Sequence, residues 1–441
     1  MLKNVLIIAF LLLVTIFFRT YKLDKFYSFE WDQERDSIVI NSIIQDKKPV
    51  LIGPRVINDK GFFTGPYHYY YLLPFYILFD GNPIAGAYAA LLVELVTLVA
   101  IYIVCLKIFG IKVAVFSSLM YSVIFGLMSW NAMYISLFSI VIFYLCYLII
   151  NNNNRVFPLL IALFTLGFNI HPSLFALIIP IVVAYLYSSK KVKLRTFLIS
   201  ILYFVIILSP LLFFDLRHDF LNFKGFYNFI FGSKTINFAP FLFLRSYWRG
   251  INLFATHDVL FLVIERILII LFGLIGLITI KDKKLKILMS VWVFHPLLLL
   301  SFYRGDIPEY YYSSSLILLT VLVGIVCAKV IPSKLIPIIV VVVVVGQYLS
   351  IIKSNYVGGL SLKNKIDVVS YIVNQKRDTQ FNVSYDLPLG MNSGYKYLFK
   401  YLGKEPTDTP DSHLYSIVLL DKSAKTDDIV YRDQILGVVR R

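Results

Sequence analysis

The chain has 441 residues, of which 59% are hydrophobic and only 15% are charged. This composition excludes an ordinary soluble domain and indicates an all-α polytopic membrane protein, because isolated strands cannot satisfy their backbone hydrogen bonds in lipid. The formal net charge of +16 is scattered over short loops. Span orientation and contact with the phosphates of membrane lipids explain this charge, and no nucleic-acid partner is expected.

Apolar runs long enough to cross a bilayer core of about 30 Å predict eleven spans. The first run, Val5–Phe18, leads into Arg19-Thr20-Tyr21-Lys22 without a small-residue cleavage site, so we expect an uncleaved span. The two runs that flank Pro172 are either separate spans or the halves of one broken helix. The predicted spans cover residues 4–20, 83–106, 111–128, 132–150, 155–169, 172–188, 196–214, 259–280, 285–302, 314–331 and 335–352.

The loops between these spans predict the topology. With the N-terminus inside, the inside loops are short, basic and nearly free of acid, as the positive-inside rule requires. Their basic residues are Lys107, Lys112, Arg155, Lys190, Lys191, Lys193, Arg195, Lys281, Lys283, Lys284, Lys286, Lys329 and Lys334. The acid-containing segments all fall on the opposite face. We therefore expect a multi-pass protein of the cell membrane with its active site on the extracytoplasmic face.

Two domains follow from this topology. Residues 1–352 form a transmembrane catalytic domain with outer loops at 21–82 and 215–258, and residues 353–441 form a small soluble α/β domain outside the membrane. The first outer loop is about 60 residues long and rich in aromatic residues, which predicts short interfacial helices. In the small domain, a helix is predicted at Lys363–Lys376, strands at Phe381–Tyr385 and Tyr415–Leu420, and one further strand within Ile429–Val439.

The candidate catalytic residues are acidic and lie a dozen residues after the first span, in Trp31-Asp32-Gln33-Glu34-Arg35-Asp36. Asp32 and Asp36 share one face of a helix, and Glu34 points elsewhere. A carboxylate next to lipid and aromatic rings is desolvated and more basic, which suits a general base. The alternative is a solvated helix start in which Glu30, Glu34 and Arg35 form surface ion pairs.

A first span followed by an acidic outer loop, many further spans and a small outer C-terminal domain resembles the GT-C glycosyltransferases. The closest resemblance is to family 39, the group of protein O-mannosyltransferases and aminoarabinose transferases. In that family an acidic pair, usually Asp-Glu, opens the first outer loop, and its aspartate is taken as the catalytic base. The resemblance implies that Asp32 is the counterpart. Because Gln33 separates the two acids here, Glu34 or Asp36 remains open as a second participant.

Later outer loops supply candidate substrate-binding residues. Cations at the membrane surface suit the phosphate of a lipid-linked donor, and Arg binds phosphate through a bidentate fork. The family resemblance implies site residues in the two loops after spans seven and nine. The candidates are Asp215, Arg217, His218, Arg304, Glu309, Tyr310 and Tyr311, together with Arg245 and Arg249, which flank Tyr247-Trp248 at helical spacing. Interfacial snorkelling of the cations and an aromatic belt of tyrosines are the alternative readings.

The sequence therefore predicts a membrane glycosyltransferase that moves a sugar from a polyprenyl-phosphate donor to a lipid, glycan or protein acceptor, with inversion implied by the family. No cofactor is required, although a divalent cation at the acidic cluster stays open. A polysaccharide polymerase or ligase is the alternative. A flippase or transporter is a third hypothesis. It rests on Glu94 alone, an acid inside the second span, because ionisable residues within spans often mark transport pathways.

Overall fold

The computed structural model describes residues 2–56, 61–124, 127–232, 248, 259–300, 307–353, 360–375, 380–407, 413–420, 428–433 and 435–440. Three predicted site residues, Arg245, Arg249 and Arg304, lie outside the described residues. The chain divides into two compact units. Unit 1 contains residues 1–19, 50–68 and 91–351, and unit 2 contains residues 20–49, 69–90 and 352–441.

Each of the eleven predicted spans contains a helix. These helices are α1 (Leu2–Thr20), α5 (Ala85–Ile108), α6 (Ile111–Ile124), α7 (Ile135–Ile150), α8 (Phe157–Ile170), α9 (Ile178–Tyr187), α10 (Leu194–Arg217), α13 (Val259–Thr279), α14 (Lys283–Leu300), α15 (Ser313–Val330) and α16 (Ile336–Lys353). Among the described residues, six helical segments are long and apolar enough to cross a membrane, and others are shorter. The prediction of a multi-pass helical membrane protein is thereby confirmed.

Shorter helical turns complete unit 1. They are η2 (Asn131–Tyr134), η3 (Asn154–Val156), η4 (Pro172–Leu177), α11 (Leu221–Tyr227), the π-helical η5 (Asn228–Gly232), η7 (Glu309–Tyr312) and η8 (Ser333–Leu335). Pro172 separates two helices rather than breaking one: α8 ends at Ile170, His171 is extended, and η4 begins the return toward α9.

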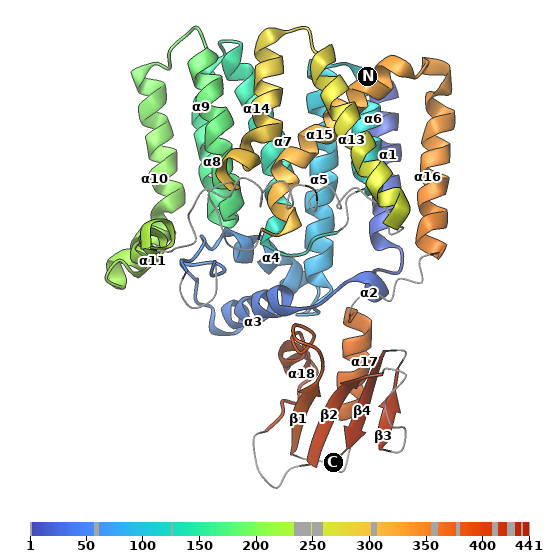
Figure 1. Ribbon diagram of the computed structural model, residues 1–441. Coiled ribbons are helices and arrows are strands. Elements are labelled where there is room, and N and C mark those ends of the chain that lie inside the picture. Colours follow the sequence, from blue (N-terminus) through green and yellow to red (C-terminus); the bar gives the residue numbers. More distant parts are fainter. Residues whose placement is uncertain are drawn as a thin grey trace. The chain divides into compact units, whose positions relative to one another are not determined.

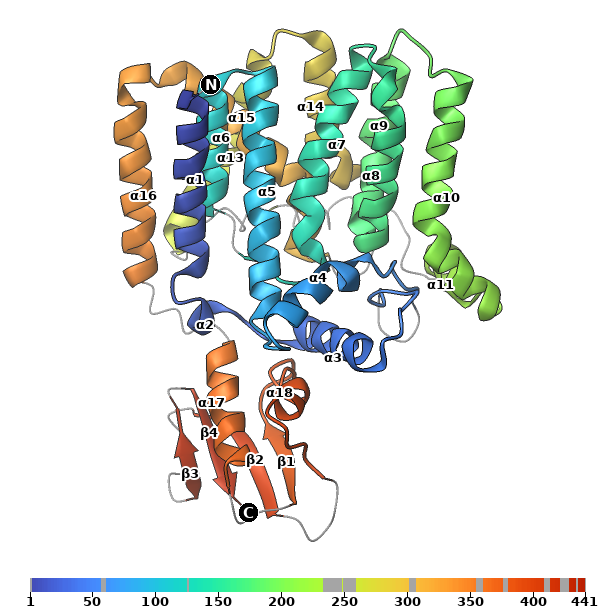
Figure 2. The same ribbon diagram turned by 180° about the vertical axis from the view of Figure 1, so that it is seen from behind.

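The basic loops gather at one end of the bundle in unit 1. In Figure 1 the connections α5–α6, α9–α10, α13–α14 and α15–α16 lie at the upper end together with the N-terminus, and Figure 2 agrees from behind. Lys284 Nζ donates to the carbonyl of Ile150 at 3.2 Å, so the α13–α14 loop also lies beside the end of α7. The loops predicted to share one side of the membrane therefore share one end of the bundle.

The core of unit 1 is built around α15. All residues of α15 from Ser313 to Val326 are buried, as expected of a helix that is apolar on every face. It packs against α6, α7, α13 and α14. Glu94 is also buried in the bundle, where its carboxylate lies 3.6 Å from the guanidinium of Arg19, so its charge is paired within α1 and α5.

Unit 2 combines part of the first outer loop with the C-terminal segment. Its helices are α2 (Leu23–Phe26), α3 (Trp31–Asp46), α4 (Tyr67–Leu78, mostly in this unit), α17 (Leu362–Val373) and α18 (Lys396–Tyr401). A four-stranded sheet has the order β1-β2-β4-β3, from Phe381–Asp386, His413–Leu419, Leu436–Arg440 and Ile429–Arg432. β1 and β2 are parallel, and the other neighbours are antiparallel.

One strand prediction was wrong. The segment expected to give a single strand within Ile429–Val439 forms the hairpin β3–β4, because a turn closed by a hydrogen bond from Asp433 N to the carbonyl of Leu436 (2.8 Å) interrupts it. The helix and the other two strands lie where they were predicted.

Buried polar contacts join the two segments of unit 2. Leu362 N donates to the carbonyl of Tyr27 at 2.8 Å. The fully buried ammonium of Lys365 donates to the carbonyls of Phe29 (2.6 Å) and Ser393 (2.8 Å). Gly394 has φ +89°, and a Cβ there would lie 2.2 Å from the carbonyl oxygen of Phe29, so only glycine fits. The loop after the first span and the C-terminal segment thus share one core.

Candidate active site

The acidic cluster lies in the first turn of α3. Glu30 is the N-cap of this helix and forms a capping box: its side chain accepts from the backbone N–H of Gln33, whose side chain in turn accepts from the backbone N–H of Glu30 at 3.0 Å. This reciprocal pair satisfies two N–H groups that the helix start would leave without partners. The helix start is therefore well defined, and so are the positions of the charged residues that follow it.

Arg35 bridges the two aspartates of this turn. Its Nη1 donates to Asp32 Oδ1 at 2.6 Å, and its Nε and Nη2 donate to Asp36 Oδ1 at 2.9 and 2.7 Å. The side chain of Asp36 is 2% exposed, whereas that of Asp32 is 43% exposed. Asp32 and Asp36 share a helix face as predicted. The alternative reading placed Arg35 in surface ion pairs with Glu30 and Glu34. In the structure Arg35 pairs with Asp32 and Asp36 instead.

The buried phenol of Tyr69, from α4, lies in the same charged cluster. Burial and the carboxylate of Asp36 raise the pKa of Tyr69 above its ordinary value, so the residue stays a hydroxyl donor. Burial alone would lower the pKa of Arg35, but Asp36 and Asp32 outweigh it and raise the pKa, so this guanidinium stays charged. Sequence reasoning missed Tyr69, whose only signal was its place in the aromatic run 67–71.

Glu34 does not join this cluster. Its two carboxylate oxygens accept hydrogen bonds from the backbone N–H groups of Gly394 (2.9 Å) and Tyr397 (3.1 Å), at the start of α18. An anion at a helix N-terminus satisfies N–H groups that have no partner within the helix. In the structure Glu34 therefore has a helix-capping position, and its catalytic role stays a prediction.

Asp215 has a comparable capping position in unit 1. Its carboxylate is buried and accepts from the backbone N–H groups of Asn222 (2.7 Å) and Phe223 (3.1 Å), at the start of α11. The chain reverses before this helix through Asp219 and Phe220, both at positive φ. The predicted substrate-binding carboxylate is thus committed to holding a turn.

Arg217 and His218 lie at the junction of α10 and α11, and both are exposed. His218 Nδ1 contacts the carbonyl of Phe214 at 2.8 Å, and its ring stacks on the Phe214 ring with centroids 4.2 Å apart. Arg217 ends the apolar helix α10. The position of Arg217 fits an anion-binding residue at the end of a span.

A segment of the first loop covers this junction. Phe63 N donates to Asn222 Oδ1 at 2.6 Å, and the Phe63 ring packs edge-on against Phe214 at 5.8 Å. On its other side the guanidinium of Arg55 lies 5.3 Å from the centre of the Phe63 ring. Residues 50–68 and the α10–α11 junction thus form one surface of unit 1, with the cation of Arg55 added to that of Arg217.

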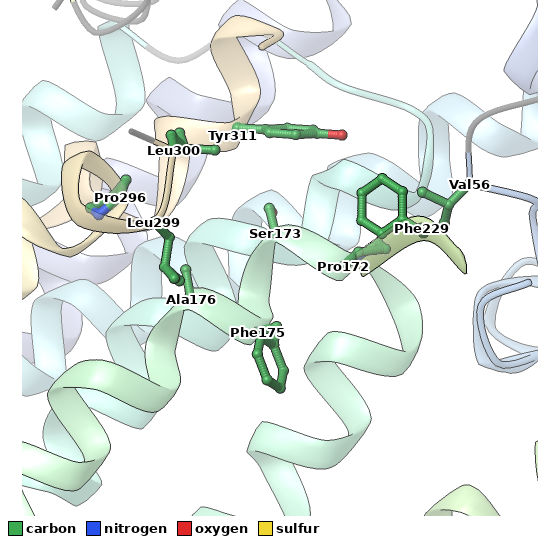
Figure 3. A pocket seen from close by; sticks show the side chains of 10 residues that line it. All are labelled: Val56, Pro172, Ser173, Phe175, Ala176, Phe229, Pro296, Leu299, Leu300 and Tyr311. Carbon is green, nitrogen blue, oxygen red and sulfur yellow. The ribbon is translucent and has the colours of Figure 1, made fainter. Parts of the chain in front are cut away.

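An apolar cavity of about 170 Å³ opens beside this surface. Figure 3 shows Tyr311 lying across it, with the hydroxyl directed toward the side of Val56 and Phe229. The remaining lining residues are Pro172, Ser173, Phe175, Ala176, Pro296, Leu299 and Leu300. The walls therefore come from the first loop, η4, η5, α14 and η7.

The predicted tyrosines pack around a buried histidine near this cavity. The ring of His171 lies edge-on to Tyr310 and Tyr311, with centroids 5.6 and 5.7 Å away, and its Nδ1 is 2.8 Å from Ser173 Oγ. The Nδ1 of His171 is thus engaged within its own turn. The half-buried Glu309 begins η7, the turn that carries both tyrosines.

Among the described residues no group of three or more His, Cys, Asp and Glu side chains is arranged to hold a metal ion. At the acidic cluster, the place between the carboxylates of Asp32 and Asp36 is taken by the guanidinium of Arg35. One guanidinium thus offsets one of the two carboxylate charges at this position.

The helical membrane bundle, the acidic helix α3 and the small C-terminal sheet occur in a chain whose fold matches that of ArnT, which confirms the GT-C fold expected from the sequence. The family model described as dolichyl-phosphate-mannose-protein mannosyltransferase matches residues 64–214, roughly a third of the chain. No curated protein gives a significant match over this chain.

Solved structures give the fold over the whole chain. ArnT from Cupriavidus metallidurans bound to undecaprenyl phosphate aligns with a TM-score of 0.64 at 13% identity, covering 99% of this chain and 97% of that one. The apo state of ArnT aligns with a TM-score of 0.63 over the same shares of the two chains. An Archaeoglobus fulgidus oligosaccharyltransferase in complex with Zn and sulfate reaches a TM-score of only 0.49 at 12% identity, over 92% of this chain and 62% of that one.

Proposed function

We propose that this protein is a membrane glycosyltransferase that transfers a sugar from a polyprenyl-phosphate donor to an acceptor on the extracytoplasmic face, with Asp32 as general base. The observation that carries the proposal is the exposed carboxylate of Asp32 sharing Arg35 with the buried Asp36, in a chain with the GT-C fold. Support for the donor class comes from the matched mannosyltransferase family and from ArnT, whose structure holds undecaprenyl phosphate.

Asp32 is the best candidate among the three predicted acids. Glu34 has both oxygens engaged at α18, and Asp36 is buried against Arg35. Only Asp32 combines solvent access with a fixed position, since the bond from Arg35 to Oδ1 orients the carboxylate. A general base must reach the proton that it removes, and a 43% exposed side chain meets that condition.

The proposed step is an inverting displacement. The acceptor hydroxyl or amine gives its proton to Asp32 while its lone pair forms a bond to the anomeric carbon. The bond from that carbon to the phosphate oxygen breaks, and its electron pair leaves with the polyprenyl phosphate. The charge of the leaving phosphate is met by a cation of the later loops, Arg217 or Arg304, because Arg35 is engaged with both aspartates on the side of the base.

The remaining candidates have supporting roles in donor binding. Arg217 and Arg55 offer exposed cations in unit 1, and Arg245, Arg249 and Arg304 stay candidates from the sequence. The apolar cavity beside Tyr311 suits prenyl carbons, because its lining is almost wholly hydrocarbon. Tyr310, Glu309 and His218 are available for hydrogen bonds to a sugar, whereas Asp215 acts by holding the turn at α11.

The proposal is tested by measuring transfer of label to product by the purified protein. The protein is supplied with a panel of radiolabelled polyprenyl-phosphate sugars and with a crude membrane extract as the source of acceptor. We expect one donor to give labelled product with the wild type and none with Asp32→Asn, while the variant still binds that donor. Glu34→Gln is the matched control, since it removes one nearby charge from a capping position. Unchanged transfer by Asp32→Asn would remove Asp32 from the mechanism. No transfer from any donor would favour the polymerase or transporter hypotheses.

A further inference from the structure

A second, larger apolar cavity lies in unit 1 among α8, α9 and α10. It measures about 540 Å³, and its lining is entirely carbon-rich: Phe157, Ile161, Phe164, Ile178, Ile181, Val182, Tyr185, Val192, Leu194 and Phe197. α10 packs along α8, whereas α9 packs against α7 and α14. The cavity is therefore a groove with α8 as its floor and with α9 and α10 as its walls.

The groove runs from the end of the bundle that carries the basic loops toward the middle of the membrane. On α8 the lining extends from Phe157 to Phe164 and on α9 from Tyr185 to Ile178, a rise of about 10 Å along each helix. One leaflet of a bilayer core is about 15 Å deep. The length of the groove thus suits the part of a single acyl chain that lies nearest the headgroup.

The rim of the groove is strongly basic. Lys190, Lys191, Lys193 and Arg195 are all exposed in the loop that joins α9 to α10. No acidic residue occurs anywhere in the sequence between Glu94 and Asp215. Lys191 Nζ lies 5.3 Å from the centre of the Tyr185 ring, so one of these cations is placed directly at the mouth of the groove.

Hydrogen bonds hold this rim in place. Asn152 Oδ1 accepts from the backbone N–H groups of Ser189 (2.9 Å) and Lys190 (3.1 Å), and Asn154 Nδ2 donates to the carbonyl of Lys190 at 2.6 Å. Ser188 Oγ donates to the same carbonyl at 3.0 Å. The basic rim therefore has a defined backbone next to the mouth of the groove.

We propose that this groove binds an anionic glycerophospholipid, with one acyl chain between α9 and α10 and the phosphate headgroup at Lys191 and its basic neighbours. Basic pockets between helices at the cytoplasmic side of membrane proteins bind anionic headgroups, and the apolar groove adds the chain contact that a basic loop alone lacks. The proposal does not depend on the glycosyltransferase activity.

The test compares dioleoyl phosphatidylglycerol with dioleoyl phosphatidylcholine, each added to the full-length protein in nonionic detergent, with bound lipid counted by native mass spectrometry. We expect phosphatidylglycerol to bind and to raise the melting temperature, and phosphatidylcholine to do neither. The triple variant Lys190→Gln, Lys191→Gln, Lys193→Gln should bind phosphatidylglycerol about tenfold more weakly or worse. Its matched control is Lys329→Gln, Lys334→Gln, in another basic loop, which should bind as the wild type does.

A second variant tests the groove without changing any charge. Val182→Trp places a large ring in the groove from a side chain that is 47% exposed, and Val341→Trp places the same ring on α16 at a side chain that is 58% exposed. We expect only Val182→Trp to lose the lipid. The proposal would be overturned if both lipids bound equally, or if the lysine variant or Val182→Trp bound phosphatidylglycerol as the wild type does. It would also be overturned if the two control variants lost the lipid to the same extent.

Discussion

Arg35 donates two hydrogen bonds to a single oxygen of Asp36, from Nε at 2.9 Å and from Nη2 at 2.7 Å. Asp36 is almost fully buried, so the pair is shielded from water and holds the guanidinium in one orientation. The third bond of Arg35 then reaches Asp32, which is exposed. The buried aspartate therefore positions the arginine, and the arginine positions the proposed base.

Asp36→Asn should lower the rate of transfer without abolishing it. An amide cannot hold the cation as a carboxylate does, so Arg35 shifts, and a misplacement of about 1 Å costs roughly a hundredfold in rate. We expect kcat to fall while KM for the donor changes less, as measured by steady-state transfer assays. Asp36→Glu should recover part of the rate. A full loss equal to that of Asp32→Asn would instead make Asp36 the base.

Glu34→Gln should lower stability and leave the chemistry intact. The carboxylate caps α18 through two backbone N–H groups, and a charged hydrogen bond contributes about 1.5–3 kcal/mol. We expect a lower melting temperature and faster proteolysis of the C-terminal segment, with an unchanged kcat per folded molecule. A large fall in kcat at full stability would return Glu34 to the catalytic group.

Asp215→Ala tests the other acid that has a capping position. Its carboxylate caps α11, and loss of such a cap costs about 1 kcal/mol. Faster cleavage by a protease near residues 218–224 is expected, with donor affinity close to that of the wild type, because the hydrogen-bond partners of this carboxylate are backbone groups of α11. Arg217→Gln is the comparison, because it removes an exposed cation and should weaken donor binding. The opposite ranking of the two variants would restore Asp215 as a binding residue.

Chelators should not inhibit transfer. Arg35 occupies the place between Asp32 and Asp36, so a divalent ion bridging these carboxylates would have to displace a guanidinium held by three hydrogen bonds. We expect equal initial rates with and without EDTA, and no stimulation when Mg²⁺, Mn²⁺ or Zn²⁺ is restored. Inhibition by EDTA that is reversed by one of these ions would show that the reaction needs a metal.

Lys365 should make stability depend on pH. Burial lowers the pKa of this amine to about 8, against the opposing influence of Glu30 and Glu34. Because the unfolded state binds this proton more tightly, stability should rise as the pH increases from about 8 toward the ordinary lysine value of about 10.4. Melting temperatures of the wild type and Lys365→Met, measured across this interval, should show the rise only in the wild type. Parallel curves would contradict the shifted pKa.

The span pattern was predictable because lipid leaves helices few alternatives. Runs such as 196–214 and 335–352 are apolar throughout, and each contains a helix close to the predicted bounds. The capping box of α3 is local as well, since Glu30 and Gln33 are three residues apart. Asp32 and Asp36 were therefore correctly expected on one helix face.

The positions of Glu34 and Asp215 were not predictable from local pattern. Each carboxylate accepts from backbone N–H groups that no motif indicates. The N–H partner Gly394 of Glu34 lies 360 positions further along the chain. The alternative reading of the sequence paired Arg35 with its neighbouring glutamates, because surface pairs are common at helix starts. Because Asp36 is buried beside Tyr69, Arg35 pairs with Asp36 instead. This burial depends on how α3 and α4 pack, which the sequence around Arg35 does not indicate.

The contact between Glu34 and Gly394 joins residues 360 positions apart. A ribosome makes about 5–20 residues per second, so α3 is synthesised on the order of tens of seconds before the partner of Glu34 exists. During this interval the helix that carries Asp32 has no C-terminal segment to cap or to pack against. The start of α3 therefore acquires its hydrogen bonds to α18 only after residues 394–397 have been synthesised.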